Sequence, residues 1–404
     1  MLTIPRDGWR EDPASMDLSR RRGGALHSGR HLMDRRKFIG GAAKGAIGAG
    51  VAGLGASSLA APAIAQERPQ IQWRLTSSFP KSLDTLYGTA EALADHVREI
   101  SDGQFDIQLF AAGEIVPGGQ VLDAVQGGTV ELGHTASYYY VGKNPAFAFG
   151  TAVPFGLNAR QQNAWFYEGG GNELLNEFYA KSGVHAMPAG NTGAQMGGWY
   201  RKEINSVEDL KGLKLRIAGL AGRVVEKLGV VPQQIAAGDI YAALERGTLD
   251  AVEFVGPYDD EKLGFYRVAP YYYYPAWWEG GAALHLMVNA DKWNSLPDSY
   301  KAMLNAASRA VNCSMMASYD YRNPLALKRL AEGGAQLRPF SQEIMQASFA
   351  AAQELHEEIA SENEDYRKLM ESQNAFKRDA YLWSQISEYT FDTFMMVKQR
   401  EGAL

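Results

Sequence analysis

The sequence contains one cysteine, Cys313, and seven histidines. A single cysteine excludes an internal disulfide, and we expect Cys313 to be a small buried side chain. The histidines after residue 65 are scattered along the chain: His96, His134, His185, His285 and His356. No C-x-x-C, C-x-x-C-H or H-E-x-x-H pattern occurs, so sites for iron–sulfur clusters, haem and zinc lack their usual ligands.

Several motifs of catalysis and nucleotide binding are also absent. After residue 65 the chain has no G-x-S-x-G elbow, no G-K-[ST] loop and no G-x-G-x-x-G fingerprint. The same part of the chain holds 30 Lys and Arg against 41 Asp and Glu, a net charge of about −11. Such an acidic chain does not suit nucleic acid or anionic membranes as partners. It also contains no run that is apolar enough to span a bilayer.

The first 65 residues have the layout of an export signal. A charged stretch, MDRRKFIG (33–40), precedes a Gly/Ala-rich apolar run, and Ala63-Ile64-Ala65 forms an A-x-A cleavage pattern. Arg35 and Arg36, with Phe38 two residues on, resemble the twin-arginine export motif. A transmembrane anchor is the alternative, but the apolar run is short, rich in glycine and followed by a cleavage pattern.

These features predict a mature chain that begins near Gln66 and is exported as a soluble periplasmic protein. We expect Met33 rather than Met1 to be the start, so that residues 1–32 would be an extension of the gene model. Twin-arginine export often serves proteins that fold around a redox cofactor. A periplasmic oxidoreductase is therefore an alternative, although the sequence lacks the usual ligands for haem and iron–sulfur clusters.

Apolar periodicity alternates between strand and helix patterns, which is typical of an α/β fold. Residues 71–77 (IQWRLTS) and 105–110 alternate like strands, and residues 83–100 between them have the spacing of an amphipathic helix. Near the C-terminus, helical patterns cover residues 342–363 and 365–399. Before them, a Leu-Pro-Asp sequence predicts the start of another helix, with proline in the first turn: Leu296, Pro297 and Asp298.

The last helical pattern carries an apolar stripe on one face. Its members are Leu382, Ile386, Tyr389, Thr393 and Met396. The stripe either docks on its own domain or pairs with a second subunit in a homodimer, and the sequence alone leaves both interpretations open.

A helix–turn–strand unit occurs twice. VLDAVQGGTVELG (121–133) and IYAALERGTLDAV (240–252) each combine a short helix, a Gly-Thr pair and an apolar–acidic–apolar strand. Chance similarity is the alternative, but the echo predicts two α/β domains of similar design. Ligands of open α/β sheets bind beyond the carboxyl ends of the strands. The loops HTASYYY (134–140) and EFVGPYDD (253–260) would therefore face one cleft.

Arg216 and two glutamates are the candidate binding residues. Arg216 lies on an alternating strand, where it is either a solvated edge residue or a planar fork that clasps a carboxylate. Glu253 and Glu279 have apolar or aromatic neighbours, and a buried glutamate is costly unless it is paired or binds a cation.

One arginine cannot neutralise two glutamates and an incoming carboxylate. A hard cation with oxygen ligands, such as sodium or calcium, would fit, and Gln195 could add a neutral oxygen. The alternative is that Glu253 and Glu279 are ordinary salt-bridge partners. Two carboxylates could also carry out acid–base chemistry, but no nucleophile is evident beside them.

These stretches resemble the TRAP-transporter solute-binding proteins, the DctP family. LKGLKLRIAG (210–219), with the Gly-Thr-acidic strand and DAVEFVGP (250–257), is similar to the family as a whole. NTGAQMGGWY (191–200), EFVGPYDDEKLGF (253–265) and YYYYPAWWEGG (271–281) resemble the subgroup that binds 2-oxo acids and similar monocarboxylates. The resemblance covers nearly the whole mature chain, to about residue 400.

The resemblance implies an α/β two-domain periplasmic binding protein with a ligand cleft, crossing hinge strands and long C-terminal helices. Its first domain would comprise residues 66–193 and 283–322. The second would comprise residues 194–282 and 323–380, and residues 381–404 would form a C-terminal helix.

For the site, the resemblance implies that Arg216 holds the substrate carboxylate. Gln195, Glu253, Phe254 and Glu279 match positions around a cation that bridges to the substrate, with sodium preferred and calcium as the alternative. Relatives often have tryptophan at position 254. A ligand role of the backbone carbonyl would survive the change to phenylalanine, but a contact through an indole would not.

Two aromatic contacts complete the expected site. Trp278 belongs to a wall that would exclude water and strengthen each electrostatic contact, and Tyr139 or Tyr140 would close the cleft from the first domain. The implied function is non-catalytic capture of a small 2-oxo monocarboxylate such as pyruvate, and its delivery to the permease subunits of a TRAP transporter. Lactate or another hydroxy acid bound with calcium is one alternative, and a periplasmic enzyme is another.

Overall fold

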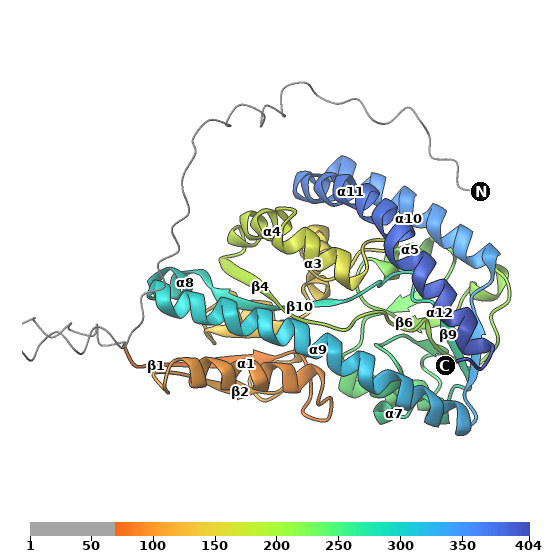
Figure 1. Cartoon of the computed structure of the whole chain (residues 1–404), viewed down its shortest axis with the longest axis horizontal. Coiled ribbons are helices and arrows are strands. Elements are labelled where there is room, and N and C mark those ends of the chain that lie inside the picture. The colour runs from red at the N-terminus through yellow and green to blue at the C-terminus, as the bar shows by residue number, and fades with distance from the viewer. Residues whose placement is uncertain (1–68) are drawn as a thin grey trace, which may run out of the picture. The chain divides into compact units, whose positions relative to one another are not determined.

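Two mixed β-sheets organise the chain in the computed structural model, which describes residues 69–404 (Figure 1). The predicted export signal, its cleavage pattern and both candidate start residues lie outside the described residues. The first sheet has the strand order β2 (Phe105–Phe110), β1 (Ile71–Ser77), β3 (Leu132–Thr135), β10 (Ala283–Asn289) and β4 (Val184–Asn191). The second has the order β7 (Val231–Gln233), β6 (Lys214–Arg216), β8 (Ala251–Val252), β5 (Gly198–Tyr200), β9 (Tyr271–Tyr274) and β11 (Gln336–Pro339).

Helices pack around both sheets. The chain before β8 provides α1 (Leu86–Ile100), α2 (Val121–Gln126), α3 (Ala159–Tyr167), α4 (Gly171–Ala180), α5 (Ala221–Lys227) and α6 (Ile240–Glu245). The chain after β8 provides α7 (Pro257–Leu263), α8 (Ala290–Ser295), α9 (Asp298–Glu332), α10 (Gln342–Glu362), α11 (Glu364–Ser384) and α12 (Thr390–Arg400). The predicted strands over 71–77 and 105–110 are confirmed. The helix predicted from Leu83 begins three residues later, because residues 81–85 form turns.

The two sheets share one design, as the repeated helix–turn–strand unit predicts. In the first sheet β2, β1 and β3 are parallel, β10 is antiparallel to β3, and β4 is antiparallel to β10. In the second sheet β7, β6 and β8 are parallel, and β5 and β9 follow with the same alternation of direction. We call the elements around the first sheet the first lobe and those around the second sheet the second lobe.

Each repeated unit reverses its chain at a glycine. Gly128 follows α2 and Gly247 follows α6, with φ values of +69° and +75°. Beyond each glycine, two successive backbone N–H groups donate to one helical carbonyl, that of Ala124 in the first unit and Ala243 in the second. This bonding closes the end of the helix and directs the chain into the next strand, β3 or β8.

The chain crosses between the lobes through neighbouring segments. Residues 192–197 connect β4 to β5, and residues 275–282 connect β9 to β10. Thr192 N donates to Ala282 O at 3.0 Å, and Ala282 N donates to Thr192 Oγ1 at 3.1 Å. The two segments therefore lie side by side at the boundary of the sheets. Helix α9 is a third connection, since it contacts β4 and α1 of the first lobe and α7 of the second (Figure 1).

Two expectations about the helices have different outcomes. Cys313 is exposed on α9, so the prediction of a buried cysteine is wrong; Val311, Asn312 and Met315 occupy the buried side of that helix instead. The segment predicted as helical over 365–399 is confirmed as α11, a π-helical turn (Gln385–Tyr389) and α12. Within residues 69–404, no helix is both long and apolar enough to cross a membrane.

The glycine after α2 gives a test of this fold. Alanine at position 128 would meet no neighbouring atom but would be held at positive φ, so Gly128→Ala should lower the free energy of unfolding by about 1 kcal/mol. Gly142 is the control, because it also has open space and lacks a positive φ. Gly142→Ala should be neutral or slightly stabilising. Urea unfolding measures both, and equal stability of the two variants would contradict the argument from backbone strain.

Candidate functional site

Arg216 ends strand β6 and is 2 % exposed. Leu215 and Ile217 are buried as well, so the arginine is an interior residue rather than a solvated edge residue. Its Nε donates to the carbonyl of Ile235 at 3.3 Å, and its Nη1 donates to Glu253 Oε2 at 2.9 Å and to the Glu253 carbonyl. Nη2 makes none of these bonds.

Glu253 follows strand β8 and lies beside Arg216, because β6 and β8 are neighbours in the second sheet. Its backbone N donates to the carbonyl of Arg216 at 2.9 Å, and its side chain is fully buried. Burial raises the pKa of Glu253 to about 7, although the Arg216 guanidinium and the backbone N–H of Ala218 act in the opposite direction. Burial acts to lower the pKa of Arg216, but the nearby Glu253, Tyr139, Tyr138 and Glu279 together outweigh it and raise that pKa.

Glu279 comes from the crossing segment 275–282. The four tyrosines before this segment form β9, and Tyr272 and Tyr273 are core residues. Gly280 follows the glutamate and lies so close to the chain at Leu157 that a Cβ would be 2.8 Å from its carbonyl. Glu279 is thereby held with 2 % exposure. Burial raises the pKa of its carboxyl well above the usual range, and the charge of Glu253 adds to the rise.

Gln195 comes from the other crossing segment, 192–197. Its Nε2 donates to Thr192 Oγ1 at 3.0 Å, and the same hydroxyl accepts the bond from the backbone of Ala282. This network orients the amide, so that its oxygen is directed away from the threonine. The predicted residues Gln195 and Glu279 are therefore held at the point where the two crossing segments are bonded to each other.

Three buried oxygen atoms in this region have no hydrogen-bond partner among the described residues. They are Gln195 Oε1, Glu253 Oε1 and Glu279 Oε2. Buried polar atoms are nearly always paired, and a set made only of oxygens suits a hard cation such as sodium or calcium. The described residues contain no group of three or more His, Cys, Asp or Glu side chains that could hold a metal. A cation here would therefore need the amide oxygen and backbone carbonyls beside the two carboxylates.

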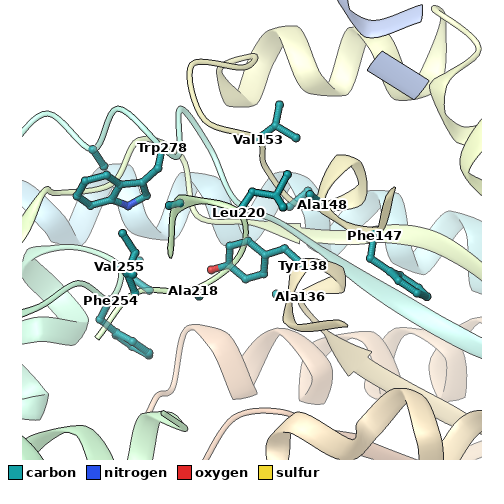
Figure 2. Packing of buried hydrophobic residues seen from close by; sticks show 14 of the residues in the cluster. Ala136, Tyr138, Phe147, Ala148, Val153, Ala218, Leu220, Phe254, Val255 and Trp278 are labelled. Atoms are coloured by element: carbon teal, nitrogen blue, oxygen red, sulfur yellow. The ribbon is translucent and has the colours of Figure 1, made fainter. Parts of the chain in front are cut away.

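Phe254 and Trp278 line the same region with aromatic surface (Figure 2). The guanidinium carbon of Arg216 lies 5.4 Å from the centre of the Phe254 ring, a distance at which a cation and an aromatic face attract each other. The indole Nε1 of Trp278 is buried and has no hydrogen-bond partner among the described residues. It lies near Glu253, and its N–H acts to lower the pKa of that carboxyl.

The 3₁₀-helix Ser137–Tyr140 contributes tyrosines from the first lobe. Tyr139 lines two small cavities beside Arg216. Tyr140 is turned away, because its hydroxyl bonds to Thr135 Oγ1 at 2.9 Å and accepts from the backbone of Leu122 at 3.1 Å.

Sequence reasoning missed Tyr138. Its hydroxyl is directed toward the loops of the second lobe (Figure 2), and its proximity acts to lower the pKa of Glu279. Its ring packs on Gly219, where a Cβ would be 2.6 Å from Tyr138 Cδ2 and φ is +66°. The glycine that ends LKGLKLRIAG could have indicated a close approach by another part of the chain.

Two cavities flank Arg216. One, of about 10 Å³, is enclosed by residues of both lobes that include Tyr138, Gln195 and Phe254; this is room for roughly one water molecule. The other, of about 100 Å³, opens between Gly118 of the first lobe and Ile235 of the second. Residues of both lobes therefore meet around Arg216.

Comparison with protein families gives a match over most of the described chain. Residues 76–363 match the bacterial extracellular solute-binding protein family 7, DctP. A monocarboxylate 2-oxoacid-binding periplasmic protein from Nostoc is 52 % identical over 331 residues, which cover 82 % of this chain and 91 % of that protein.

Solved structures are similar as well. A TRAP transporter solute-binding protein from Bordetella bronchiseptica, a dimer with copurified calcium and picolinate in its active site, is 48 % identical with a TM-score of 0.82. The match covers 83 % of this chain and 100 % of that one. A TRAP periplasmic solute-binding protein from Pseudoalteromonas atlantica, with bound sodium and pyruvate, is 38 % identical with a TM-score of 0.78, over 80 % of this chain and 98 % of that one. The predicted α/β two-domain fold and the predicted family are confirmed.

The raised carboxyl pKa values predict how a cation would bind. A cation must displace the protons that Glu253 and Glu279 retain in its absence, so binding releases protons. Affinity should therefore fall as the pH falls below about 7, by up to about tenfold per pH unit for each proton released. Calorimetric titration at pH 6, 7 and 8, in two buffers that differ in ionisation enthalpy, measures both quantities. An equal affinity at pH 6 and pH 8 would contradict the prediction.

Proposed function

We propose that this chain, which belongs to the bacterial extracellular solute-binding proteins of family 7, captures small 2-oxo monocarboxylates such as pyruvate together with a cation. It would deliver them to the membrane permease subunits of a TRAP transporter. One observation carries the proposal. Buried Arg216 has three buried residues near it, Gln195, Glu253 and Glu279, each with a side-chain oxygen that lacks a hydrogen-bond partner among residues 69–404.

In this proposal each residue has a separate role in binding. The guanidinium of Arg216, through Nη2, receives the carboxylate of the acid in a charge-assisted hydrogen bond. Gln195, Glu253, Glu279 and the backbone carbonyl of Phe254 would hold the cation, which supplies a positive charge to the carboxylate and the 2-oxo oxygen. Trp278 and Phe254 exclude water, so that each electrostatic contact is stronger than it would be in solvent.

The charges favour a cation without deciding which one. Two glutamates, one substrate carboxylate and Arg216 sum to a formal charge of −2, which calcium would cancel and sodium would halve. The relatives include one with calcium and one with sodium. Picolinate and pyruvate share a carboxylate with a second donor atom beside it, and this pair can hold one cation. We retain sodium as the expected ion and calcium as the alternative.

The remaining parts of the proposal concern location and mode of action. The family is one of extracellular binding proteins, and a periplasmic location after twin-arginine export is our proposal for this chain. Binding without catalysis is proposed on the same ground. The domain boundaries stay a prediction, and we propose that Tyr139 and Tyr138 close the site from the first lobe.

The test of function uses pyruvate and sodium with the purified mature chain. A binding protein should show a raised melting temperature in their presence, and pyruvate should be recovered unchanged. Lactate with calcium is the comparison ligand. Turnover of pyruvate, or a melting temperature that none of these ligands raises, would overturn the proposal.

Glu279→Gln separates a ligand role from a structural one. Removing one of two neighbouring buried carboxylates should leave the unliganded protein as stable or more stable, because burial and like charge penalise Glu279. The same change should weaken sodium-dependent pyruvate binding by at least about tenfold, since one charged ligand is lost. Thermal melting and calorimetry measure the two effects. Glu357→Gln, on the exposed side of α10, is the control and should change neither the melting temperature nor the pyruvate affinity. If Glu279→Gln keeps the wild-type affinity, Glu279 is not a ligand of the site.

The proposed partners include a second copy of this chain, bound through the C-terminal segment to form a homodimer. Large apolar side chains on α11, the π-helical turn and α12 are exposed by 41 to 66 % of their surface: Tyr381, Leu382, Trp383, Ile386, Tyr389, Phe391, Phe394, Met396 and Val397. Exposed apolar surface on this scale usually marks an interface. A second copy is the proposed occupant, since the similar Bordetella bronchiseptica protein is a dimer.

Charge on this surface should break the dimer. Ile386→Glu combined with Phe394→Glu should convert a dimeric mass into a monomeric one in light scattering after size exclusion. Gln399→Glu, an exposed polar position on α12, should leave the mass unchanged. A wild-type chain that is monomeric at micromolar concentration would contradict the proposal.

A further inference from the structure

Asp84 lies in the turn between β1 and α1 of the first lobe, and its carboxylate meets side chains of α7 in the second lobe. Asp84 Oδ2 accepts a hydrogen bond from the Tyr258 hydroxyl at 2.9 Å and from Arg322 Nη1 at 3.2 Å. Asp84 Oδ1 accepts from Lys262 Nζ. One carboxylate therefore joins three donors, two of which belong to the other lobe.

Tyr258 is the centre of this cluster. Lys262 Nζ lies 4.0 Å from the centre of its ring, and the guanidinium carbon of Arg322 lies 4.9 Å from it. The backbone N of Tyr258 also donates to Asn323 Oδ1 at 3.0 Å. The ring is thus held between two cations while its hydroxyl is directed to Asp84, so the cluster is a network rather than a single surface ion pair.

Helix α7 is fixed to the second lobe and joined to the candidate site. It begins at Pro257, three residues after Phe254. Asp260 Oδ2 accepts from Trp199 Nε1 at 3.0 Å and from the Tyr272 hydroxyl at 2.7 Å, and Asp259 accepts from the Tyr319 hydroxyl of α9. A force on α7 is therefore transmitted to the sheet that carries the candidate cation ligands.

We infer that Asp84 is a closure-determining residue, which holds the two lobes together through Tyr258 and Lys262 and so slows release of the bound acid. The inference rests on the proposed function, because retention is defined by a ligand. Tyr258 and Lys262 reach Asp84 from the other lobe, so opening of the lobes would separate them from it. Removing it should act mainly on the rate of dissociation.

The test compares Asp84→Asn with Asp123→Asn. Asp123 is a matched control, because its side chain is 48 % exposed against 51 % for Asp84, and it pairs with Lys143 inside the first lobe. Stopped-flow displacement of pyruvate in sodium buffer should show dissociation roughly fivefold faster in Asp84→Asn. The association rate and the melting temperature of the unliganded protein should change little, and Asp123→Asn should match the wild type.

A second measurement separates failure of this latch, the contact of Asp84 with Tyr258 and Lys262, from failure of the proposed function. Spin labels on α1 and α10, one on each lobe, report the distance between the lobes without any ligand. The Asp84→Asn distances should shift toward a more open population than those of the wild type and of Asp123→Asn. If wild-type chain binds pyruvate but Asp84→Asn releases it within twofold of the wild-type rate, the latch is refuted. If no variant binds pyruvate, the proposed function fails; an unchanged distance distribution in Asp84→Asn would then refute the latch independently.

Discussion

Two carboxylates and one guanidinium occupy a region that is almost closed to water, and the rest of the site can be understood from this constraint. Arg216 satisfies one oxygen of Glu253 and the backbone carbonyl of the same residue. It does not satisfy Glu253 Oε1 or Glu279 Oε2, two buried atoms that have no hydrogen-bond partner among the described residues. A site that contains uncompensated negative charge at high desolvation cost is poised for a cation.

The duplicated sheet design explains why the charges meet where they do. Parallel strands β6 and β8 bring Arg216 and Glu253 to neighbouring positions at their carboxyl ends, which is the edge where open α/β sheets bind ligands. Gln195 and Glu279 reach the same place from the two segments that cross between the sheets. Because these segments are hydrogen-bonded through Thr192 and Ala282, the ligand set lies at the boundary about which the lobes would move.

Sequence periodicity predicted part of this arrangement, and its limits have physical causes. Alternation left the environment of Arg216 open, and the structure buries it together with Leu215 and Ile217. Aromatic neighbours indicated that Glu279 is buried. Tyr138 was not predicted because residues 137–140 form a 3₁₀-helix, in which neither the strand period nor the α-helix period applies. Cys313 was misplaced because the frequent burial of cysteine says nothing about which side of a long helix it occupies. The contact of Asp84 with Tyr258 joins residues 174 positions apart, and no local pattern contains that information.

Closure and charge are linked by the same residues. Glu253 and Glu279 repel each other most strongly when the lobes are closed and water is excluded, so ionised glutamates alone oppose closure. Protons relieve that repulsion when no cation is bound, and a cation that displaces them also relieves it and offers a charge to the carboxylate of the acid. The Asp84 cluster adds a favourable contact that does not depend on the ligand. The Asp84 contact stabilises the closed state, and the repulsion between the two glutamates opposes it. A bound cation reduces only the repulsion, so the balance between open and closed states would depend on whether a cation occupies the site.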